Sequence, residues 1–357
     1  MSEHNESIPS PTSSEIAAID SELLRLLHLR IQAETRTGGG SILRRLPESA
    51  ASIAARLSQG DTQGLDLELA IGWLQHADSI CRRAAHPASP VVYLGPIYSY
   101  SYLASVKFFG SGAEFVPVAT IAAAFDEIVR GQAAFGVVPV ENSTDGRVVD
   151  TLGMFARSPV EICGEVLLPI HHCLLGRQLA RNEVGEVHSK PQALSQCRNW
   201  LSEHLPDAKL VEVMSTAAAA ATAANNSNVA AIASREAGIH QGLRVIDENI
   251  EDNQQNVTRF VVIGNCRKPA QGTDKTSLMF QLSHKPGSLA AAMTAFQTAG
   301  INLTWIESFP LPNCPNEYLF FVELEGHRDE QHVSEAIAQL RILAVRLEVL
   351  GSYPKGS

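Results

Sequence analysis

The chain has 357 residues, 45% of them hydrophobic, which is enough for two or three domains with buried cores. Its net charge is −10 and only 18% of its residues are charged, so it has no overall basic surface for nucleic acid or an anionic membrane. The N-terminus lacks a signal peptide's basic start and apolar core, and no later stretch approaches about eighteen uninterrupted apolar residues. We therefore expect a cytoplasmic protein that binds neither nucleic acid nor membrane.

The metal-ligating residue types are not arranged for a metal or a cofactor. The six cysteines lie far apart without a C-x-x-C pair, which favours buried, reduced thiols over a zinc site or a disulfide framework. His171 and His172 are expected in the strand segment from Leu167 to Leu175, where neighbouring side chains point to opposite faces and cannot easily chelate one ion. We expect no metal and no cofactor.

The N-terminal part of the chain has a helical pattern. Residues 1–13 are rich in serine and proline, which is typical of a disordered leader. From Ile16 to about Ala85 the apolar residues recur at helical spacing, and glycine-containing segments at 38–40 and 60–64 interrupt the run. We predict three helices that form an all-α domain over residues 14–86.

From Val91 onward, short apolar strands alternate with helices. We predict strands at 91–94, 114–118, 135–140, 160–175, 210–214, 229–233 and 259–263, and helices ending near 109 and covering 121–130, 191–205 and 217–224. This alternation predicts an α/β domain with substantial parallel sheet over residues 91–266. The polar Gly/Pro stretch at 267–274 is predicted to be a linker.

The C-terminal part repeats a simpler pattern over residues 275–354. Strands are expected at 277–282, 303–308, 318–324 and 345–350, with helices at 287–299 and 333–343. The order βαββαβ predicts a small α+β domain of the ferredoxin-like type.

Turns that follow strands and open helices are where α/β proteins usually place binding residues, and polar clusters lie in several of them. The segment at residues 95–102, GPIYSYSY, carries many hydroxyl groups and no charge. It is either the capped start of a helix with aromatic side chains on the surface, or part of a binding site. PVENSTDGR at 139–147 is, taken alone, best explained as an ordinary Asn/Asp/Gly turn.

Two further clusters carry groups that suit an anionic substrate. His188, Ser189 and Lys190 precede a proline-led helix. Thr258 and Arg259 stand together at the mouth of a strand, where arginine can hold a carboxylate through a bidentate fork while threonine donates a proton or hydrogen bond. Alternatively, the tripeptide TRF at residues 258–260 is simply the exposed end of a strand.

Six short motifs occur in order between Tyr93 and Gly264: YLGP, VVPVENS, LPIHHCLL, SKPQALSQC, STAAAA and N-x-TRF. Together they resemble the prephenate dehydratase family. The resemblance implies two α/β lobes around a cleft, similar to a periplasmic binding protein. It also implies the conversion of prephenate to phenylpyruvate with loss of water and carbon dioxide.

By this resemblance Thr258 is the principal catalytic residue, assisting departure of the ring hydroxyl, and Arg259 positions a carboxylate. A free threonine hydroxyl is a very weak acid, so the polar cleft must supply much of the stabilisation and decarboxylation must drive aromatisation. The matching positions imply a set of substrate-binding residues: Glu141, Asn142, Ser143, Ser99, His172, Ser189, Gln192, Ser215 and Thr216.

Three positions depart from the family's usual pattern. Tyr98 and Tyr102 stand where relatives commonly have glycine and histidine, so a bulky side chain is expected where backbone would approach the cleft. Lys190 stands where many relatives have histidine, which adds positive charge beside a dianionic substrate.

The C-terminal βαββαβ unit resembles an ACT domain, which in bacterial dehydratases senses L-phenylalanine. The implied regulatory residues are Gly287, Ser288 and Leu289 in a GSL turn, and Glu307 and Ser308 in the segment IESFP. Phe309 replaces the arginine of the usual ESRP segment. ACT units generally pair, which implies a homodimer or a higher homo-oligomer, and the alternative is a structural dimerisation domain that senses nothing.

The N-terminal helices resemble a chorismate mutase domain through their length, their position and the opening IDSELLRLLHLR. That mutase holds a dicarboxylate with several cations. Arg30 matches one of them and Ser79 also matches, whereas Ser14, Glu15, Ser41, Ser49, Ala50 and Arg83 depart from the pattern. Arg36, Arg44 and Arg45 are alternative cations. A structural remnant is favoured over an active mutase.

The sequence therefore favours a prephenate dehydratase of phenylalanine biosynthesis that is feedback-regulated by phenylalanine. Two alternatives stay open: a bifunctional chorismate mutase/prephenate dehydratase, and a non-catalytic amino-acid-responsive binding protein. Thr258 and Arg259 favour the enzyme, whereas Tyr98 and Tyr102 favour the binding protein.

Overall fold

The computed structural model describes residues 13–37, 46–48, 50–58, 66–87, 90–177, 180–311 and 317–356. The chain divides into two compact units near residue 88, and residues 109–113 group with the first. Ser13, the last residue of the expected leader, begins the first helix. Residues 1–12, the glycine interruptions, Cys314, Ser41, Arg44, Arg45 and Ser49 lie outside the described residues. No described helix is long and apolar enough to cross a membrane.

The first unit contains the three helices expected from the apolar spacing: α1 (Ser13–Thr37), α2 (Ala50–Leu57) and α3 (Leu67–Ala85). Asp66 caps α3 because its carboxylate accepts hydrogen bonds from the backbone N–H groups of Glu68 and Leu69. An ion pair between Arg30 and Asp78 joins α1 to α3.

The second unit begins with a mixed sheet, which forms the first lobe. Its strand order is β2 (Phe115–Val118), β1 (Val91–Leu94), β3 (Phe135–Asn142), β11 (Val257–Gly264) and β5 (Glu161–Pro169), and β4 (Gly146–Arg147) pairs with β3. Strands β2, β1 and β3 are parallel, whereas β11 is antiparallel to both of its neighbours. The helices of this lobe are α4 (Tyr100–Phe109), α5 (Ile121–Val129) and α6 (Val149–Phe155).

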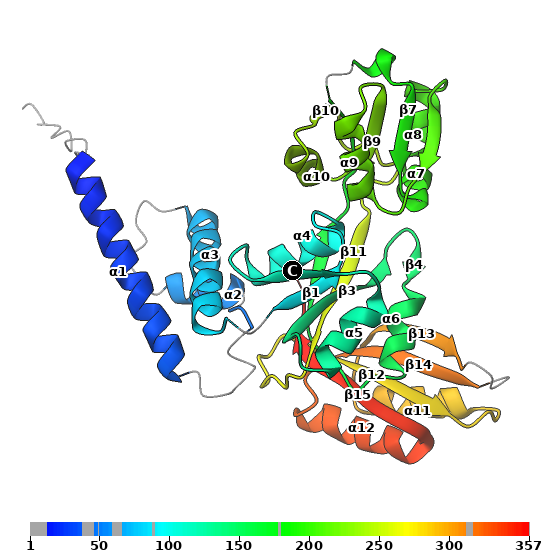
Figure 1. Ribbon diagram of the computed structural model, residues 1–357. Helices are drawn as coiled ribbons and strands as arrows, with labels where there is room; N and C mark the ends of the chain where they lie inside the picture. Colours follow the sequence, from blue (N-terminus) through cyan, green and yellow to red (C-terminus); the bar gives the residue numbers. More distant parts are fainter. Residues whose placement is uncertain are drawn as a thin grey trace, which may run out of the picture. The chain divides into compact units, whose positions relative to one another are not determined.

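A second mixed sheet forms the second lobe (Figure 1). Its order is β10 (Arg244–Asp247), β6 (Cys173–Gly176), β9 (Val229–Ala233), β7 (Glu186–Ser189) and β8 (Lys209–Glu212). Side chains of α7 (Pro191–Gln196) and α8 (Arg198–His204) pack on one face. Those of α9 (Thr216–Asn225) and α10 (Arg235–His240) pack on the other. The expected two-lobed α/β architecture is confirmed.

The expectation of one strand from 160 to 175 is wrong, because β5 and β6 belong to different sheets. Residues 170–172 are the connection that carries the chain from the first lobe to the second. His171 and His172 therefore lie in this connection rather than on opposite faces of one strand.

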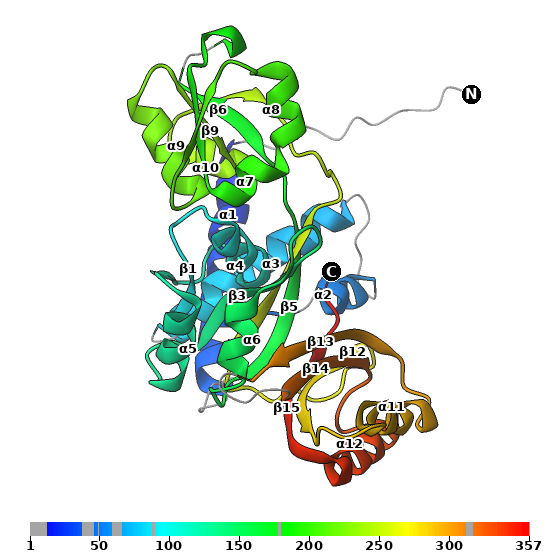
Figure 2. The same ribbon diagram turned by 90° about the vertical axis from the view of Figure 1, so that its right-hand side faces the viewer.

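The C-terminal residues form the expected βαββαβ unit. Its antiparallel sheet has the order β13 (Leu303–Pro310), β14 (Tyr318–Glu325), β12 (Asp274–Leu282) and β15 (Ala344–Pro354). Helices α11 (Ser288–Thr298) and α12 (Gln331–Leu343) cover one face of this sheet, as Figure 2 shows. The ferredoxin-like architecture is confirmed.

The other face of the C-terminal sheet packs directly against the first lobe. Met279, Phe321 and Tyr353 join Phe155 and Val261 in one continuous hydrophobic core. At Gly351 the approach is so close that a Cβ atom would lie 2.2 Å from the carbonyl oxygen of Ile162. The C-terminal sheet is therefore part of the same packed body as the first lobe.

The expectation that all cysteines are reduced is also wrong, because Cys163 and Cys266 form a disulfide. They are 103 residues apart in the sequence, and the antiparallel pairing of β5 with β11 brings their Cα atoms to 5.9 Å. Cys81, Cys173 and Cys197 are free and buried.

Candidate active site

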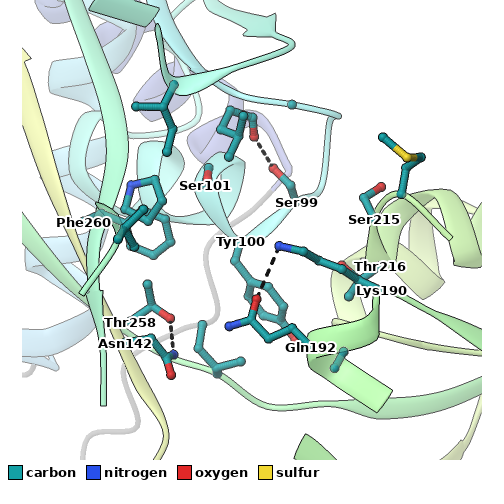
Figure 3. A pocket seen from close by; sticks show the side chains of 18 of the residues that line it. Ser99, Tyr100, Ser101, Asn142, Lys190, Gln192, Ser215, Thr216, Thr258 and Phe260 are labelled. Atoms are coloured by element: carbon teal, nitrogen blue, oxygen red, sulfur yellow. Dashed lines mark hydrogen bonds between the residues drawn. The ribbon is translucent and has the colours of Figure 1, made fainter. Parts of the chain in front are cut away.

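A cavity of about 430 Å³ lies between the two lobes, and Figure 3 shows the side chains around it. The first lobe contributes the ends of β1, β3 and β11 and the start of α4. The second lobe contributes the starts of α7 and α9, and the connection between the lobes contributes Ile170 and His172. Polar groups therefore converge from several turns onto one cavity, which is typical of a small-molecule site.

Thr258 lies in this cavity with its hydrogen bonding fixed by Asn142. The Asn142 Oδ1 atom accepts from the backbone N–H groups of Thr144 (2.9 Å) and Asp145 (3.0 Å), so the Nδ2 atom must be the donor side. Nδ2 donates to Asn256 Oδ1 and to Thr258 Oγ1, both at 2.8 Å. Because Thr258 Oγ1 accepts this bond, and no described residue accepts from it, its own proton can point at a ligand.

Two of the helices that begin at the cavity, one from each lobe, have a serine hydroxyl at their start. Ser99 precedes α4 and its Oγ accepts from the backbone N–H of Tyr102 (3.3 Å), while Ser215 caps α9 by accepting from Ala218 N–H (3.0 Å). The N-terminal turn of a helix attracts anions through its N–H groups and its dipole. The cavity is therefore suited to negative charge on two sides.

Lys190 is the only lysine or arginine among the described residues that line the cavity. Its Nζ donates to Gln192 Oε1 at 3.3 Å (Figure 3), and the Gln192 amide nitrogen donates to Asp145 of the first lobe. Gln196 also donates to Asp145, at 2.8 Å. Asp145 thus joins the two lobes and orients the glutamine that holds the ammonium group.

Tyr100, His172 and Gln196 line the cavity and form a partly buried hydrogen-bonded network. The Tyr100 hydroxyl lies 2.9 Å from His172 Nδ1 and the Gln196 Oε1 atom lies 2.9 Å from His172 Nε2. Burial lowers the pKa of His172, although the hydrogen bond with Gln196 opposes the shift. The imidazole is therefore neutral near pH 7 and adds no charge to the cavity.

The structure brings seven of the expected site residues to the cavity: Ser99, Asn142, His172, Gln192, Ser215, Thr216 and Thr258. Four others do not line it. Glu141 and Arg259 pair with each other on the opposite face of the first sheet. Ser143 accepts from Val257 N–H and joins the ends of β3 and β11, and Ser189 is fully buried with its hydroxyl donating to Ile232 O.

Several cavity residues were missing from the sequence-based expectation, including Tyr100, Ser101, Asp150, Gln196 and Phe260. Two of them had a usable signal. Gln196 lies four residues after Gln192, so both share one helix face. Phe260 lies two residues after Thr258, so both share one strand face.

Tyr98 does not fill the cavity, contrary to the expectation for a bulky residue at this position. Its backbone is in the left-handed region, with φ of 63°, where glycine is favoured. Its ring leaves the cavity and packs against His240 of the second lobe, with centroids 4.2 Å apart, and against Tyr102 at 5.1 Å. This contact joins the lobes instead of blocking them.

The expected regulatory residues are divided between two places. Gly287 has φ of 84° and open space around it, directly before Ser288 and Leu289 at the start of α11. Glu307, in contrast, pairs with Arg147 of the first lobe at 2.8 Å, and Ser308 is exposed on the other face of β13. Phe309 packs beside Gly153 and Phe321 in the core shared with the first lobe.

Arg30 and Arg82 of the N-terminal helices are engaged with carboxylates, whereas Arg36 donates to the amide oxygen of Gln32. Arg30 pairs with Asp78 and, at 3.3 Å, with Glu34. Arg82 pairs with Asp78 at 2.7 Å, whereas Arg83 is exposed. Ser79 donates to His76 O and accepts from Gly112 N–H.

Two α/β lobes around a cavity with a presented hydroxyl, one ammonium group and two helix starts define a small-molecule enzyme of the two-lobed α/β class. In the described part of the chain, no group of three or more His, Cys, Asp or Glu side chains is arranged to hold a metal ion. A family profile, prephenate dehydratase, matches residues 91–268. The bifunctional chorismate mutase/prephenate dehydratase of Aquifex aeolicus is 37% identical over 96% of each chain. The chain belongs to the prephenate dehydratase family.

Solved structures agree with this membership. A prephenate dehydratase from Arthrobacter aurescens, solved in complex with L-Phe, is 31% identical with a TM-score of 0.70, over 74% of this chain and 90% of its own. GqqA, described as a novel type of quorum-quenching acylase, is 28% identical with a TM-score of 0.68, over 74% of this chain and 98% of its own.

Proposed function

We propose that this chain converts prephenate to phenylpyruvate, water and carbon dioxide in the cavity between its two lobes. The observation that carries the proposal is the Asn142–Thr258 pair, which presents a hydroxyl proton to the cavity. Loss of the ring hydroxyl needs a hydrogen-bond donor at the departing oxygen. As the C–O bond breaks, the electrons of the ring–carboxylate bond move into the ring, carbon dioxide leaves, and a proton from solvent balances the loss of water.

The two carboxylates of prephenate require positive potential, and the cavity offers it without Arg259. We assign Lys190 to one carboxylate, since it is the lysine that lines the cavity and its ammonium group is already oriented by Gln192. The helix starts at Ser99 and Ser215 suit the other. Asn142, His172, Gln192 and Thr216 complete the polar lining.

The rival function is a non-catalytic amino-acid-responsive binding protein. Tyr98 and Tyr102 were the features that favoured it, yet Tyr98 leaves the cavity open and packs on His240. The likeness to the acylase GqqA shows a different activity in a similar chain. The free Thr258 proton beside a fixed amide supports the dehydratase reaction, which needs a donor at one departing oxygen.

We further propose that residues 14–86, 91–266 and 275–354 act as a mutase-like remnant, the dehydratase domain and a phenylalanine-sensing ACT domain in a cytoplasmic homo-oligomer. The relative from Arthrobacter aurescens was solved with L-Phe, which supports the ligand. The open left-handed turn at Gly287 suits the approach of an amino acid to the backbone. Ile306, 48% exposed on the edge strand β13, suits pairing with a second copy.

Replacing Thr258 tests the reaction assignment. Thr258→Ala is expected to lower kcat on prephenate by about a hundredfold or more, because the donor at the departing oxygen is lost. The fold is expected to persist, since Asn142 keeps its bond to Asn256. Thr298→Ala, an exposed helix position in the C-terminal unit, is the matched control with unchanged phenylpyruvate production. Near-normal turnover of Thr258→Ala contradicts the assignment.

Replacing Lys190 tests the carboxylate contact. Lys190→Met is expected to raise KM for prephenate about tenfold or more, the usual scale for losing a hydrogen bond to a charged group, while Lys190→Arg keeps most of the affinity. Lys209→Met, which removes an exposed lysine paired with Glu186, is the control for net charge. Equal KM values for Lys190→Met and wild type overturn the contact.

The N-terminal helices are expected to have little or no chorismate mutase activity. Arg30 is already neutralised by Asp78 and Glu34, and a dianion needs several free cations. The measurement is prephenate formation from chorismate by the purified full chain, with the chain's own dehydratase rate as the reference. Prephenate formation at a matching rate restores the bifunctional alternative, which the relative from Aquifex aeolicus represents.

L-phenylalanine is expected to bind the C-terminal unit and inhibit dehydration at millimolar or lower concentration, measured by titration calorimetry and initial rates. Gly287→Val is expected to abolish the binding heat, because valine strains a φ of 84° and fills the open turn. Gly300→Val carries similar strain at φ of 65°, at the far end of α11, and should retain binding. If L-phenylalanine gives no binding heat and no inhibition with the wild-type chain, the C-terminal domain has a structural role and does not sense phenylalanine.

A further inference from the structure

Strand β11 carries its side chains alternately to two different places. Thr258 and Phe260 line the cavity, whereas Arg259 between them points to the opposite face of the sheet. Because successive side chains of a strand point to opposite faces, the neighbour of a cavity residue cannot reach the cavity. The guanidinium of Arg259 instead meets the C-terminal sheet.

Five charged residues surround that meeting point, and we refer to them as the interface charge cluster: Glu141, Glu165, Arg259, Lys275 and Glu323. Arg259 contacts Glu141 at 3.1 Å and Glu165 at 3.5 Å, both in the first lobe, and bonds to Glu323 of β14 in the C-terminal sheet. The Arg259 guanidinium also lies 5.0 Å from the ring centroid of Trp305 in β13.

The second cation of the cluster completes the connection between the two sheets. Lys275 of β12 contacts Glu165 of β5 at 3.0 Å and Glu323 of β14 at 3.2 Å. Glu165, Arg259 and Glu323 are each less than a tenth exposed. Burial acts to lower the pKa of Arg259, but Glu323, Tyr353 and Glu165 outweigh it and raise the pKa. A buried charge that loses its partner is strongly destabilised, so the cluster holds its members in place.

The cluster lies directly behind the Thr258–Asn142 hydrogen bond. In the pairing of β11 with β3, Thr258 is opposite Asn142 and Arg259 is opposite Glu141, so consecutive cross-strand pairs carry the hydrogen bond and the ion pair. The regular pairing breaks immediately afterwards, between Arg259 and Phe260. The Arg259–Glu141 contact therefore holds the two strands in register where Thr258 needs its amide partner.

We propose that Arg259 is a positioning residue, held by Glu323 of the C-terminal sheet, that keeps Thr258 aligned with Asn142 and makes the dehydratase site depend on that sheet. The proposal rests on the proposed catalytic role of Thr258. It also gives the C-terminal unit a direct route to the reaction, because a movement of β14 moves the partner of Arg259, one residue from Thr258.

The test compares Glu323→Gln, Arg259→Gln, Arg259→Lys and the double variant Arg259→Gln/Glu323→Gln in the full chain, with kcat and KM measured on prephenate. Each single glutamine variant is expected to lower kcat about tenfold or more while KM changes less than about twofold, the signature of lost transition-state alignment. The double variant should be hardly slower than either single variant. Arg259→Lys should recover part of kcat, because it keeps the charge.

Arg328→Gln is the matched control. Arg328 of the C-terminal unit contacts Glu161 of β5 at 3.3 Å, and Glu161 pairs with Gly264 at the other end of β11. The Arg328→Gln substitution removes an ion pair across the same interface but far from Thr258, so it should leave kcat unchanged. Thermal unfolding of every variant separates misfolding from misalignment. If Arg259→Gln does not fold, Arg259→Lys and Glu323→Gln decide the matter.

Three outcomes overturn the proposal. A raised KM with unchanged kcat in the Arg259 variants makes Arg259 a substrate ligand. If the kcat loss of the double variant is the product of the two single losses, Arg259 and Glu323 act independently. If Arg328→Gln lowers kcat as much as the Arg259 variants do, the cause is a general weakening of the interface. None of these outcomes changes the expected Thr258→Ala result, so a failure of this inference is distinguishable from a failure of the proposed function.

Discussion

The two-sided strand β11 is the constraint on which the rest of the catalytic unit depends. It is hydrogen-bonded to β3 along one edge and to β5 along the other, so its register and the direction of its side chains are fixed. One face gives Thr258 and Phe260 to the cavity. The other gives Arg259 to the charged interface and Val261 to the core shared with the C-terminal sheet. Residues that line the cavity therefore alternate, within four positions of β11, with residues that contact the C-terminal sheet, because strand side chains alternate with a period of two.

The cavity exists only when the lobes are held together, and polar and aromatic contacts share this task. Asp145 accepts from Gln192 and Gln196 across the cleft, and Tyr98 extends from the first lobe onto His240 of the second. Asp145 has a further effect, since it orients the glutamine that holds Lys190. A contact between the lobes therefore also orients the ammonium group that we propose for a substrate carboxylate.

The C-terminal unit shows how a substituted motif residue can take a new structural role. Phe309 stands where the resemblance to ACT domains implies an arginine, and its ring packs between the first lobe and Phe321. Glu307 of the same segment pairs with Arg147 of the first lobe. This part of the IESFP segment is therefore engaged with the first lobe, whereas the turn at Gly287 before α11 has open space around it.

The sequence by itself determined the helices and strands with regular periodicity, and the turns that bear Asn142, Ser215 and Thr258, because turn chemistry and apolar spacing are local properties. It could not show that the apolar run from 160 to 175 crosses between two sheets, since a continuous run is compatible with one strand or two. Nor could it assign a partner to Arg259 or Cys163, or show that the hydroxyl of Ser189 is bonded to Ile232. Those outcomes were decided by tertiary structure, because which face of a strand meets solvent, substrate or another sheet depends on residues that are distant in the sequence and fold against it.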